Sequence, residues 1–284
     1  MSQIKQTKNR ITSAQTTAKI TKAMQTIASM RLRKFQKQAN VVNKYFNSLI
    51  ESLGSTLSGN NNPILVGNPN GKTLVIIAGA SRGFCGGLHR TIVLDGYKQL
   101  KEKGVDLNDS SNVELITINR TTNRMASKLG ANIKANFDGP YKNIDIFSVL
   151  PIAELVNRLW QKGGYKAVYI VFAKNLSTTK PSIIVDKILP FNIEQHTNVE
   201  NLTIVNYDTP QSEIIPEALT LISQTVIHQG ILSTQSAEES ARIVAMSQAT
   251  DNAKTLEDKL KVVYFRLRQS KITQEISEII GGSL

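Results

Sequence analysis

The sequence predicts an α/β plus α protein: an antiparallel coiled coil of long N- and C-terminal helices with an inserted Rossmann-like α/β domain. Residues 4 to 53 contain no proline or glycine, the middle of the chain alternates strand-like with helical runs, and apolar residues near the C-terminus recur every three or four positions. We therefore divide the chain into an N-terminal helix at 1–55, an α/β domain at 72–210 and a C-terminal helix at 213–284.

The N-terminal helix is predicted from one apolar stripe. Its members are Ile20, Met24, Ala28, Phe35, Ala39, Val42, Phe46, Leu49 and Leu53. This spacing is typical of a coiled-coil seam. Some 50 residues at roughly 1.5 Å each give a helix of about 75 Å, which the stretch rich in glycine and asparagine at 59–71 ends.

The middle segment is predicted to form a parallel sheet. Apolar, strand-like runs lie at 74–80, 113–119, 166–174 and 182–191, and helical stretches lie at 88–103, 121–129 and 144–160. Strands separated by helices indicate βαβ units, which build a Rossmann-like domain. A fold of this kind does not by itself specify a function.

The C-terminal helix has a second apolar stripe. It comprises Met246, Ala249, Ala253, Leu256, Leu260, Val263 and Leu267. Ser236 and Glu239 fit a capping box, which leaves open a helix break near Gly230. The two stripes bury each other most simply in an antiparallel pair, and Ile272, Ile276, Ile279 and Ile280 continue the second stripe beyond the reach of its partner.

Composition excludes several classes of protein. The chain has 284 residues, one cysteine, three histidines and a formal net charge of +12. No apolar run approaches the roughly 20 residues that span a bilayer, and the N-terminus lacks the apolar core of a signal peptide, so we expect a cytoplasmic protein. With a single cysteine and no histidine pair at ligand spacing, we expect no metal site and no bound cofactor.

Positive charge is concentrated at the N-terminus. Residues 1–50 contain no Asp or Glu but ten basic residues: Lys5, Lys8, Arg10, Lys19, Lys22, Arg31, Arg33, Lys34, Lys37 and Lys44. This imbalance favours an anionic neighbour, which is a nucleic acid, an anionic membrane surface or an acidic protein surface.

Two glycine-containing motifs resemble nucleotide-binding loops without matching them. GNPNGKT at 67–73 has three rather than four residues between its glycines and precedes a strand, so it reads as a turn. Gly83, Gly86 and Gly87 depart from the dinucleotide fingerprint, and we expect them to permit tight strand-to-helix packing. Cys85 and His89 lack a third group that orients the histidine, so we expect no catalytic residue.

Three blocks of sequence resemble the gamma subunit of F-type ATP synthase. They are ITKAMQTIASMRLRKFQ at 20–36, SRGFCGG at 81–87, and SARIVAMSQATDNA with RQSKITQEISEIIGG at 240–253 and 268–282. The resemblance runs from end to end. It implies a rotor shaft, present in one copy inside a hexamer of alpha and beta subunits, whose foot rests on the membrane c-ring beside epsilon. Nucleotide is bound by the hexamer, so the shaft itself is not an enzyme.

The resemblance also implies which residues contact partners. Met24, Arg31, Arg33 and Lys34 match positions facing acidic beta-subunit loops, and Tyr207 lies near the contact with the c-ring. Positions that hydrogen-bond a beta-subunit loop higher on the shaft correspond to Arg268, Gln269 and Thr273. The tip seated in the apolar collar of the hexamer corresponds to Ile276, Ile279 and Ile280.

Phe35 and Lys271 depart from the family pattern, in which small residues are common. The absence of a transit segment favours a bacterial protein at the cytoplasmic face of the cell membrane. Three alternatives remain open: the shaft of a specialised rotary ATPase, a basic coiled-coil protein that binds nucleic acid, and a Rossmann oxidoreductase, for which the cofactor fingerprint is missing.

Overall fold

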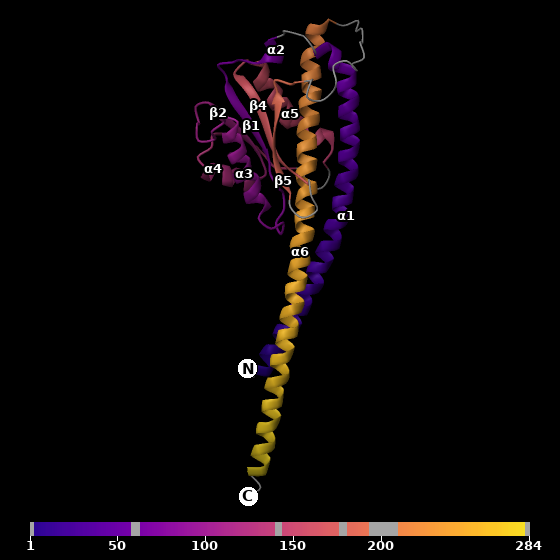
Figure 1. Ribbon diagram of the computed structural model, residues 1–284, viewed down its shortest axis with the longest axis vertical. Coiled ribbons are helices and arrows are strands. Elements are labelled where there is room, and N and C mark those ends of the chain that lie inside the picture. The colour runs from indigo at the N-terminus through magenta and orange to yellow at the C-terminus, as the bar shows by residue number, and fades with distance from the viewer. Residues whose placement is uncertain (1–2, 58–62, 140–143, 176–180, 193–209, 282–284) are drawn as a thin grey trace. The chain divides into compact units, whose positions relative to one another are not determined.

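The computed structural model describes residues 3–57, 63–139, 144–175, 181–192 and 210–281 (Figure 1). The chain packs into two compact units. The first unit comprises Met1–Met30 and Arg242–Leu284, and the second comprises Arg31–Ala241. Helices α1 (Gln3–Leu57) and α6 (Gln211–Gly281) each contribute one part to both units.

The second unit contains a five-stranded sheet. Its strands are β1 (Lys72–Ala78), β2 (Val113–Ile118), β3 (Ile133–Phe137), β4 (Tyr165–Lys174) and β5 (Ser182–Leu189). The strand order is β3-β2-β1-β4-β5, and all neighbouring pairs are parallel except β4 and β5. The predicted α/β domain is therefore confirmed as a fold, although its last strand runs antiparallel.

The sequence missed strand β3. This edge strand, IKANF, alternates half-buried with exposed residues and includes Lys134 and Asn136, so it has no continuous apolar run. Edge strands commonly have polar residues because only one neighbour covers them. Its pairing with β2, rather than its hydrophobicity, makes it a strand.

Helices cover both faces of the sheet. Helices α3 (Leu88–Glu102) and α4 (Arg120–Lys128) lie on one face and α5 (Ile146–Gln161) on the other, as Figure 1 shows. The face with α5 also packs against α1 through Phe35, Phe46 and Ile50, and against α6 through Ile222 and Ile231. Both faces of the β-sheet are thus buried, as is typical of a doubly wound fold.

The expected turn at 67–73 is confirmed. The backbone N–H of Gly71 donates to the carbonyl of Asn68 at 2.9 Å, and the Asn68 side chain accepts from the N–H of Asn70 at 3.0 Å. A short helix, α2 (Pro63–Val66), precedes this turn and β1 follows it. The segment is therefore a connection into the first strand and does not open a helix.

The first unit pairs α1 and α6 in antiparallel fashion. Gln15 contacts Glu257 and Thr21 contacts Thr250, so position rises on one helix as it falls on the other. The buried residues of α1 here lie seven apart: Thr7, Ala14, Thr21 and Ala28. A seven-residue repeat is the signature of coiled-coil packing.

The predicted membership of this seam was partly wrong. Ile20, Leu256 and Val263 are 55%, 47% and 44% exposed, whereas Met246, Ala253 and Leu260 are buried as expected. Small alanine and threonine side chains allow two helices to approach closely, and the buried line therefore runs through them. Met246 and Leu260 also belong to this line, whereas Ile20, Leu256 and Val263 flank it and remain exposed.

Helix α6 shows no break near Gly230. It continues from Gln211 to Gly281, and both Ser236 and Glu239 lie buried in its interior. The apparent capping box is therefore wrong as a helix start. Gly230 serves close packing instead, because a Cβ there would lie 2.6 Å from Ile170 Cδ1 on β4.

Candidate partner-contact surface

The basic face of α1 is accessible. All ten basic side chains among residues 1–50 are exposed. Arg31 makes an ion pair with the buried Glu239 of α6, with 3.8 Å between Nη1 and Oε1, and its side chain remains 44% exposed. Arg33 and Lys34 are also exposed, in the part of α1 that belongs to the second unit. The surface is therefore available to an acidic partner.

The terminal segment of α6 in the first unit is exposed throughout. Arg268, Gln269 and Thr273 are all exposed, and the Thr273 hydroxyl donates to the backbone carbonyl of Gln269 at 3.0 Å. The Gln269 side chain is thus not the acceptor of this bond. Lys271, which we expected to differ from the family pattern, forms an i,i+4 ion pair with Glu275 at 3.2 Å.

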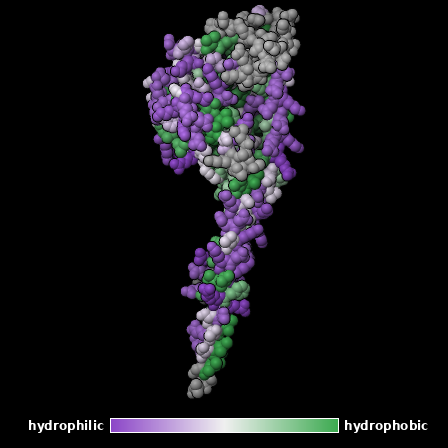
Figure 2. Space-filling view, in the orientation of Figure 1, coloured by the Kyte–Doolittle hydropathy of each residue, from purple (hydrophilic) through white to green (hydrophobic). Residues whose placement is uncertain are grey.

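Three isoleucines give this segment an apolar surface. Ile276, Ile279 and Ile280 are 51%, 72% and 61% exposed. Figure 2 shows hydrophobic surface gathered at that end of the helix. A contiguous apolar patch on a soluble protein marks an interaction site. The structure therefore places together the six C-terminal residues that the resemblance singled out.

The two remaining predicted contact residues are Met24 and Tyr207. Met24 is half-buried on α1, beside the line of buried threonine and alanine residues. Tyr207 lies outside the described residues. Phe35, which we expected to differ from the family pattern, is buried in the main core of the second unit.

Sequence reasoning missed a polar layer in the coiled coil. The hydroxyls of Thr21 and Thr250 lie 2.7 Å apart and are buried. Gln15 Nε2 donates to Glu257 Oε1 at 2.8 Å, and Lys261 lies 2.6 Å from the same oxygen. Hydrogen bonds from Lys261 and then Gln15 lower the pKa of Glu257. A buried polar pair such as Thr21 with Thr250 specifies the register of a coiled coil. The seven-residue spacing of positions 7, 14, 21 and 28 is the sequence signal that could have identified Thr21.

We expect Thr21→Val to destabilise the first unit by about 1 kcal/mol, since the Thr250 hydroxyl loses its partner on α1 and keeps only its bond to the Met246 carbonyl of its own helix. Thr21→Val combined with Thr250→Val should cost less than the sum of the two single changes, because each single change already removes the same bond between the helices. Urea unfolding of all three variants measures this coupling. Thr26→Val is the control, because Thr26 is exposed and bonds only its own helix at Lys22 O. Strict additivity would contradict the polar-layer interpretation.

The glycine-rich loop before α3 does not pack as predicted. A Cβ at Gly83, Gly86 or Gly87 would meet no atom within 4 Å, so close packing does not explain these glycines. Gly86 instead has a φ of +62°, which favours glycine. Cys85 and His89 do not face each other in a hydrogen bond, since Sγ and Nε2 both contact the carbonyl oxygen of Arg82, at 3.4 and 2.9 Å.

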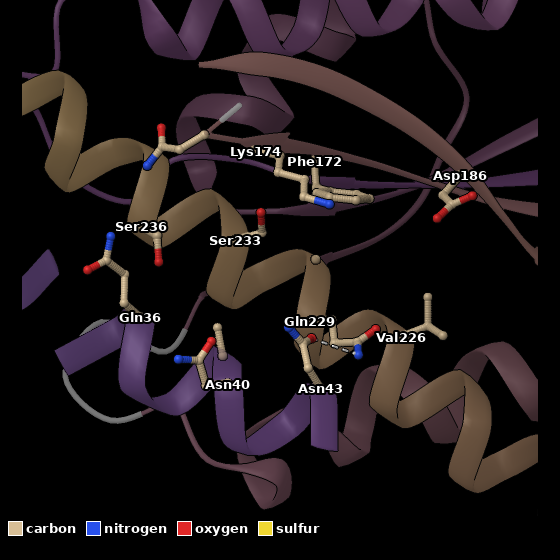
Figure 3. Close-up of a pocket in the computed structure, with 13 residues that line it drawn as sticks. Gln36, Asn40, Asn43, Phe172, Lys174, Asp186, Val226, Gln229, Ser233 and Ser236 are labelled. Atoms are coloured by element: carbon tan, nitrogen blue, oxygen red, sulfur yellow. Dashed lines mark hydrogen bonds between the residues drawn. The ribbon is translucent and has the colours of Figure 1, made fainter. Parts of the chain in front are cut away.

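A cavity of about 330 Å³ with both polar and apolar lining residues lies between α1, α6 and the strands β4 and β5 (Figure 3). Gln229 donates to Asn43 across it at 3.1 Å. Its lining is mostly neutral: Gln36, Asn40, Asn43, Gln229, Ser233 and Ser236. Among the residues that the structure describes, no three His, Cys, Asp or Glu side chains gather to hold a metal ion, and no helix has the length and apolarity needed to cross a bilayer.

Comparisons with known proteins agree on one family. The family model described as ATP synthase matches residues 3–284. An ATP synthase gamma chain of Clostridium kluyveri is 33% identical over 286 residues, which cover 97% of this chain and 95% of the relative. The gamma chain of Pelotomaculum thermopropionicum is 28% identical over 288 residues, covering 100% and 99%.

Solved structures show the same fold. A chain of the Euglena gracilis mitochondrial ATP synthase, in an assembly of OSCP, F1 and c-ring, aligns with a TM-score of 0.66 at 14% identity and covers 99% of this chain and 93% of that one. A chain of the Tetrahymena thermophila central stalk and c-ring aligns with a TM-score of 0.60 at 18% identity, covering 81% and 99%. From the family model, the relatives and the shared fold, we conclude that this chain belongs to the ATP synthase gamma-chain family.

Proposed function

We propose that the chain is the central rotating shaft of an F-type ATP synthase. It couples ion-driven rotation of the c-ring to conformational cycling of the nucleotide sites in the alpha/beta hexamer, and it carries out no catalysis itself. The observation that supports this most directly is the terminal segment of α6, whose polar residues and three apolar isoleucines are all exposed. An exposed apolar helix end of this kind needs an apolar partner.

The physical basis of this function is differential contact. A single asymmetric two-helix rod inside a ring of three similar sites touches each site differently. Only contacts that differ between conformations shift the balance among them. Rotation of the rod therefore changes the nucleotide affinity of each site in turn, and the exposed basic residues of α1 face acidic loops of the beta subunits.

The further partners follow from the same proposal. The epsilon subunit and the c-ring contact the α/β domain, with Tyr207 near the c-ring, and the chain is peripheral at the cytoplasmic face of a bacterial membrane. The Euglena and Tetrahymena assemblies, which include a c-ring, support this context. The proposal assigns no metal and no cofactor to this chain.

Co-purification tests the proposal. A tagged chain expressed in its own cells should isolate with two different nucleotide-binding subunits, each in three copies per shaft. Native mass spectrometry measures this ratio. Recovery of the chain without those subunits, or micromolar affinity of the isolated chain for ATP by calorimetry, would count against a shaft without nucleotide sites.

We expect Arg268→Ala to weaken coupling in the assembled complex, because an exposed guanidinium is well suited to hydrogen-bond a facing loop. ATP synthesis and ATP-driven ion pumping should fall while the circular dichroism of the isolated chain stays unchanged. Arg266→Ala is the matched control, since residues two positions apart on an α-helix point to nearly opposite sides. Equal rates for wild type and Arg268→Ala would refute the assigned contact.

Nucleic-acid binding is the second candidate, and the ten exposed basic residues on α1 favour it. Such binding is dominated by phosphate contacts and weakens steeply with salt. Titration of the isolated chain with duplex DNA and with RNA at two salt concentrations distinguishes the candidates. Salt-sensitive affinity for DNA or RNA, without co-purification of ATPase subunits, would favour nucleic-acid binding over the shaft function.

A further inference from the structure

The strand order locates the crevice at which a sheet of this kind usually takes its ligand. From the central β1 the chain proceeds to β2 and β3 on one side, and β4 and β5 lie on the other. The order therefore reverses between β1 and β4. In open α/β sheets, ligands bind beyond the carboxyl ends of the strands at this point.

Helix α6 crosses this crevice within the second unit. Ile231 and Leu232 belong to the core on the face of the sheet that holds α5, whereas Ala237 belongs to the core on the opposite face, with α3. The helix therefore passes over the carboxyl edge of the sheet between these positions. The residues of this turn are polar and yet buried: Thr234, Gln235, Ser236 and Glu238.

Thr234 bridges the two strands that flank the crevice. Its hydroxyl accepts from the backbone N–H of Ala173, at the end of β4, at 3.1 Å and donates to the carbonyl of Ala78, at the end of β1, at 3.1 Å. The neighbouring Ser233 donates to the carbonyl of Ala173 at 2.9 Å. Backbone groups that diverge at the end of a sheet thus find their partners on α6.

Glu238 fills the anion position of the loop after β1. Its carboxylate accepts from the backbone N–H of Ser81 at 2.5 Å and from that of Arg82 at 3.0 Å. The Ser81 hydroxyl lies 3.1 Å from the same carboxylate and 3.0 Å from Gln235 Oε1. The Glu238 residue is only 1% exposed. Successive backbone N–H groups in this loop are the feature with which nucleotide-binding folds hold phosphate.

We propose that α6 supplies an internal ligand to this α/β domain: Glu238 and Thr234 occupy the crevice that would otherwise take an external anionic ligand, and they clamp the domain to the helix. The mechanical part rests on the proposed function, because torque from the c-ring enters through the α/β domain and leaves through α6. Buried hydrogen bonds from a carboxylate to two backbone N–H groups resist displacement better than apolar sliding contacts do. On this proposal the crevice has no room for the phosphate of a nucleotide, because Glu238 already accepts from the backbone N–H groups of Ser81 and Arg82.

Anion rescue tests the internal ligand in the purified full chain. In Glu238→Ala the two N–H groups lose their acceptor, and we expect Tm to fall by roughly 5 °C or more. Sodium formate should then raise Tm of the variant more than sodium chloride at equal ionic strength. Wild type and Glu217→Ala, an exposed position on the same helix, should respond equally to the two salts. An identical response of Glu238→Ala to both salts would overturn the proposal.

Two additional measurements keep the test decisive. If Glu238→Ala does not accumulate as folded chain, the yield of folded chain after refolding in formate and in chloride gives the same comparison. Thr234→Val should lower Tm without any specific response to formate, since it removes a hydroxyl and not an anion. A formate response in Thr234→Val would show a general salt effect and contradict the assignment.

In the assembled complex, Glu238→Ala should lose ion pumping per ATP hydrolysed while hydrolysis continues. Pumping equal to that of wild type would overturn the mechanical part of the proposal. If the wild-type chain fails to co-purify with nucleotide-binding subunits, the shaft function fails instead, whereas the formate result on the isolated chain stands independently.

Discussion

Replacing Glu114 by glutamine is expected to lower the free energy of unfolding by roughly 3 kcal/mol at neutral pH. Glu114 is 5% exposed and lies near the start of β2. Its carboxylate accepts from Lys72 on β1 at 2.9 Å, from Lys134 on β3 at 3.2 Å and from the Tyr165 hydroxyl on β4 at 2.6 Å. A neutral amide leaves two ammonium groups together without the anion that links four strands.

The pH dependence of this effect has a defined sign. Burial raises the pKa of Glu114, but hydrogen bonds from Lys72, Tyr165 and Lys134 outweigh it and lower the pKa from 4.5 to about 2. A group whose pKa is lowered by folding stabilises the folded state at pH values above its pKa in the unfolded chain. For Glu114 this contribution is lost as pH falls from about 4.5 toward 2. Burial and then the bond to Glu114 raise the pKa of Tyr165.

Urea unfolding of wild type and Glu114→Gln at pH 7 and near pH 3 measures the effect. The difference between the two proteins should shrink by more than half at the lower pH. Asp138→Asn is the control, because the ion pair of Asp138 with Arg120 is exposed on both sides and should matter by less than about 0.5 kcal/mol. A difference that stays constant with pH would contradict the assigned role of the charge.

Gly79→Ala is expected to destabilise the second unit by about 3 kcal/mol. Gly79 follows β1, and an added Cβ would collide with the Thr122 side chain on α4 and lie 2.9 Å from the carbonyl oxygen of Ile118 on β2. Backbone at a strand end cannot retreat without disturbing the sheet. The Asn119 side chain also donates to the carbonyl of Gly79 at 2.8 Å, which holds this segment in place.

Thermal and urea unfolding of a small set of variants measures this close approach. Gly83→Ala lies in the same connection, but its Cβ would meet nothing within 4 Å, so we expect it to be neutral within about 0.5 kcal/mol. Thr122→Ala introduced with Gly79→Ala should recover part of the loss, because it removes the closest contact, with Thr122 Oγ1, and leaves those with the Cβ of residue 122 at 2.8 Å and the Ile118 carbonyl oxygen at 2.9 Å. Equal effects of Gly79→Ala and Gly83→Ala would disprove the packing argument.

The contrast between these two glycines shows where sequence reasoning fails. Both stand between a strand and a helix, and the pattern drew attention to Gly83, Gly86 and Gly87. The close contact is made by Gly79, because the approach of α4 depends on how the chain returns after β2. Likewise, Leu256 belongs to the apolar stripe but is exposed, whereas Thr250 is buried beside Thr21.

The sequence by itself determined the elements whose signal is local and periodic. Long runs without proline or glycine defined the two end helices, continuous apolar runs defined β1, β2 and β4, and the terminal motif RQSKITQE with its isoleucines identified the family and the exposed end of α6. These patterns predict the elements correctly because the local propensity of each residue and its burial favour the same secondary structure as those of its neighbours along the chain.

Only the tertiary structure decided which distant residues meet. Tertiary packing determines which heptad positions are buried in the coiled coil. It also pairs the edge strand β3 with β2 and places Glu238 against the loop at Ser81 and Arg82. Such contacts join positions up to 242 residues apart, as between Gln15 and Glu257, and whether a polar group is buried depends on the partner that it finds in three dimensions. No local pattern distinguishes a glutamate that faces water from one that fills a crevice.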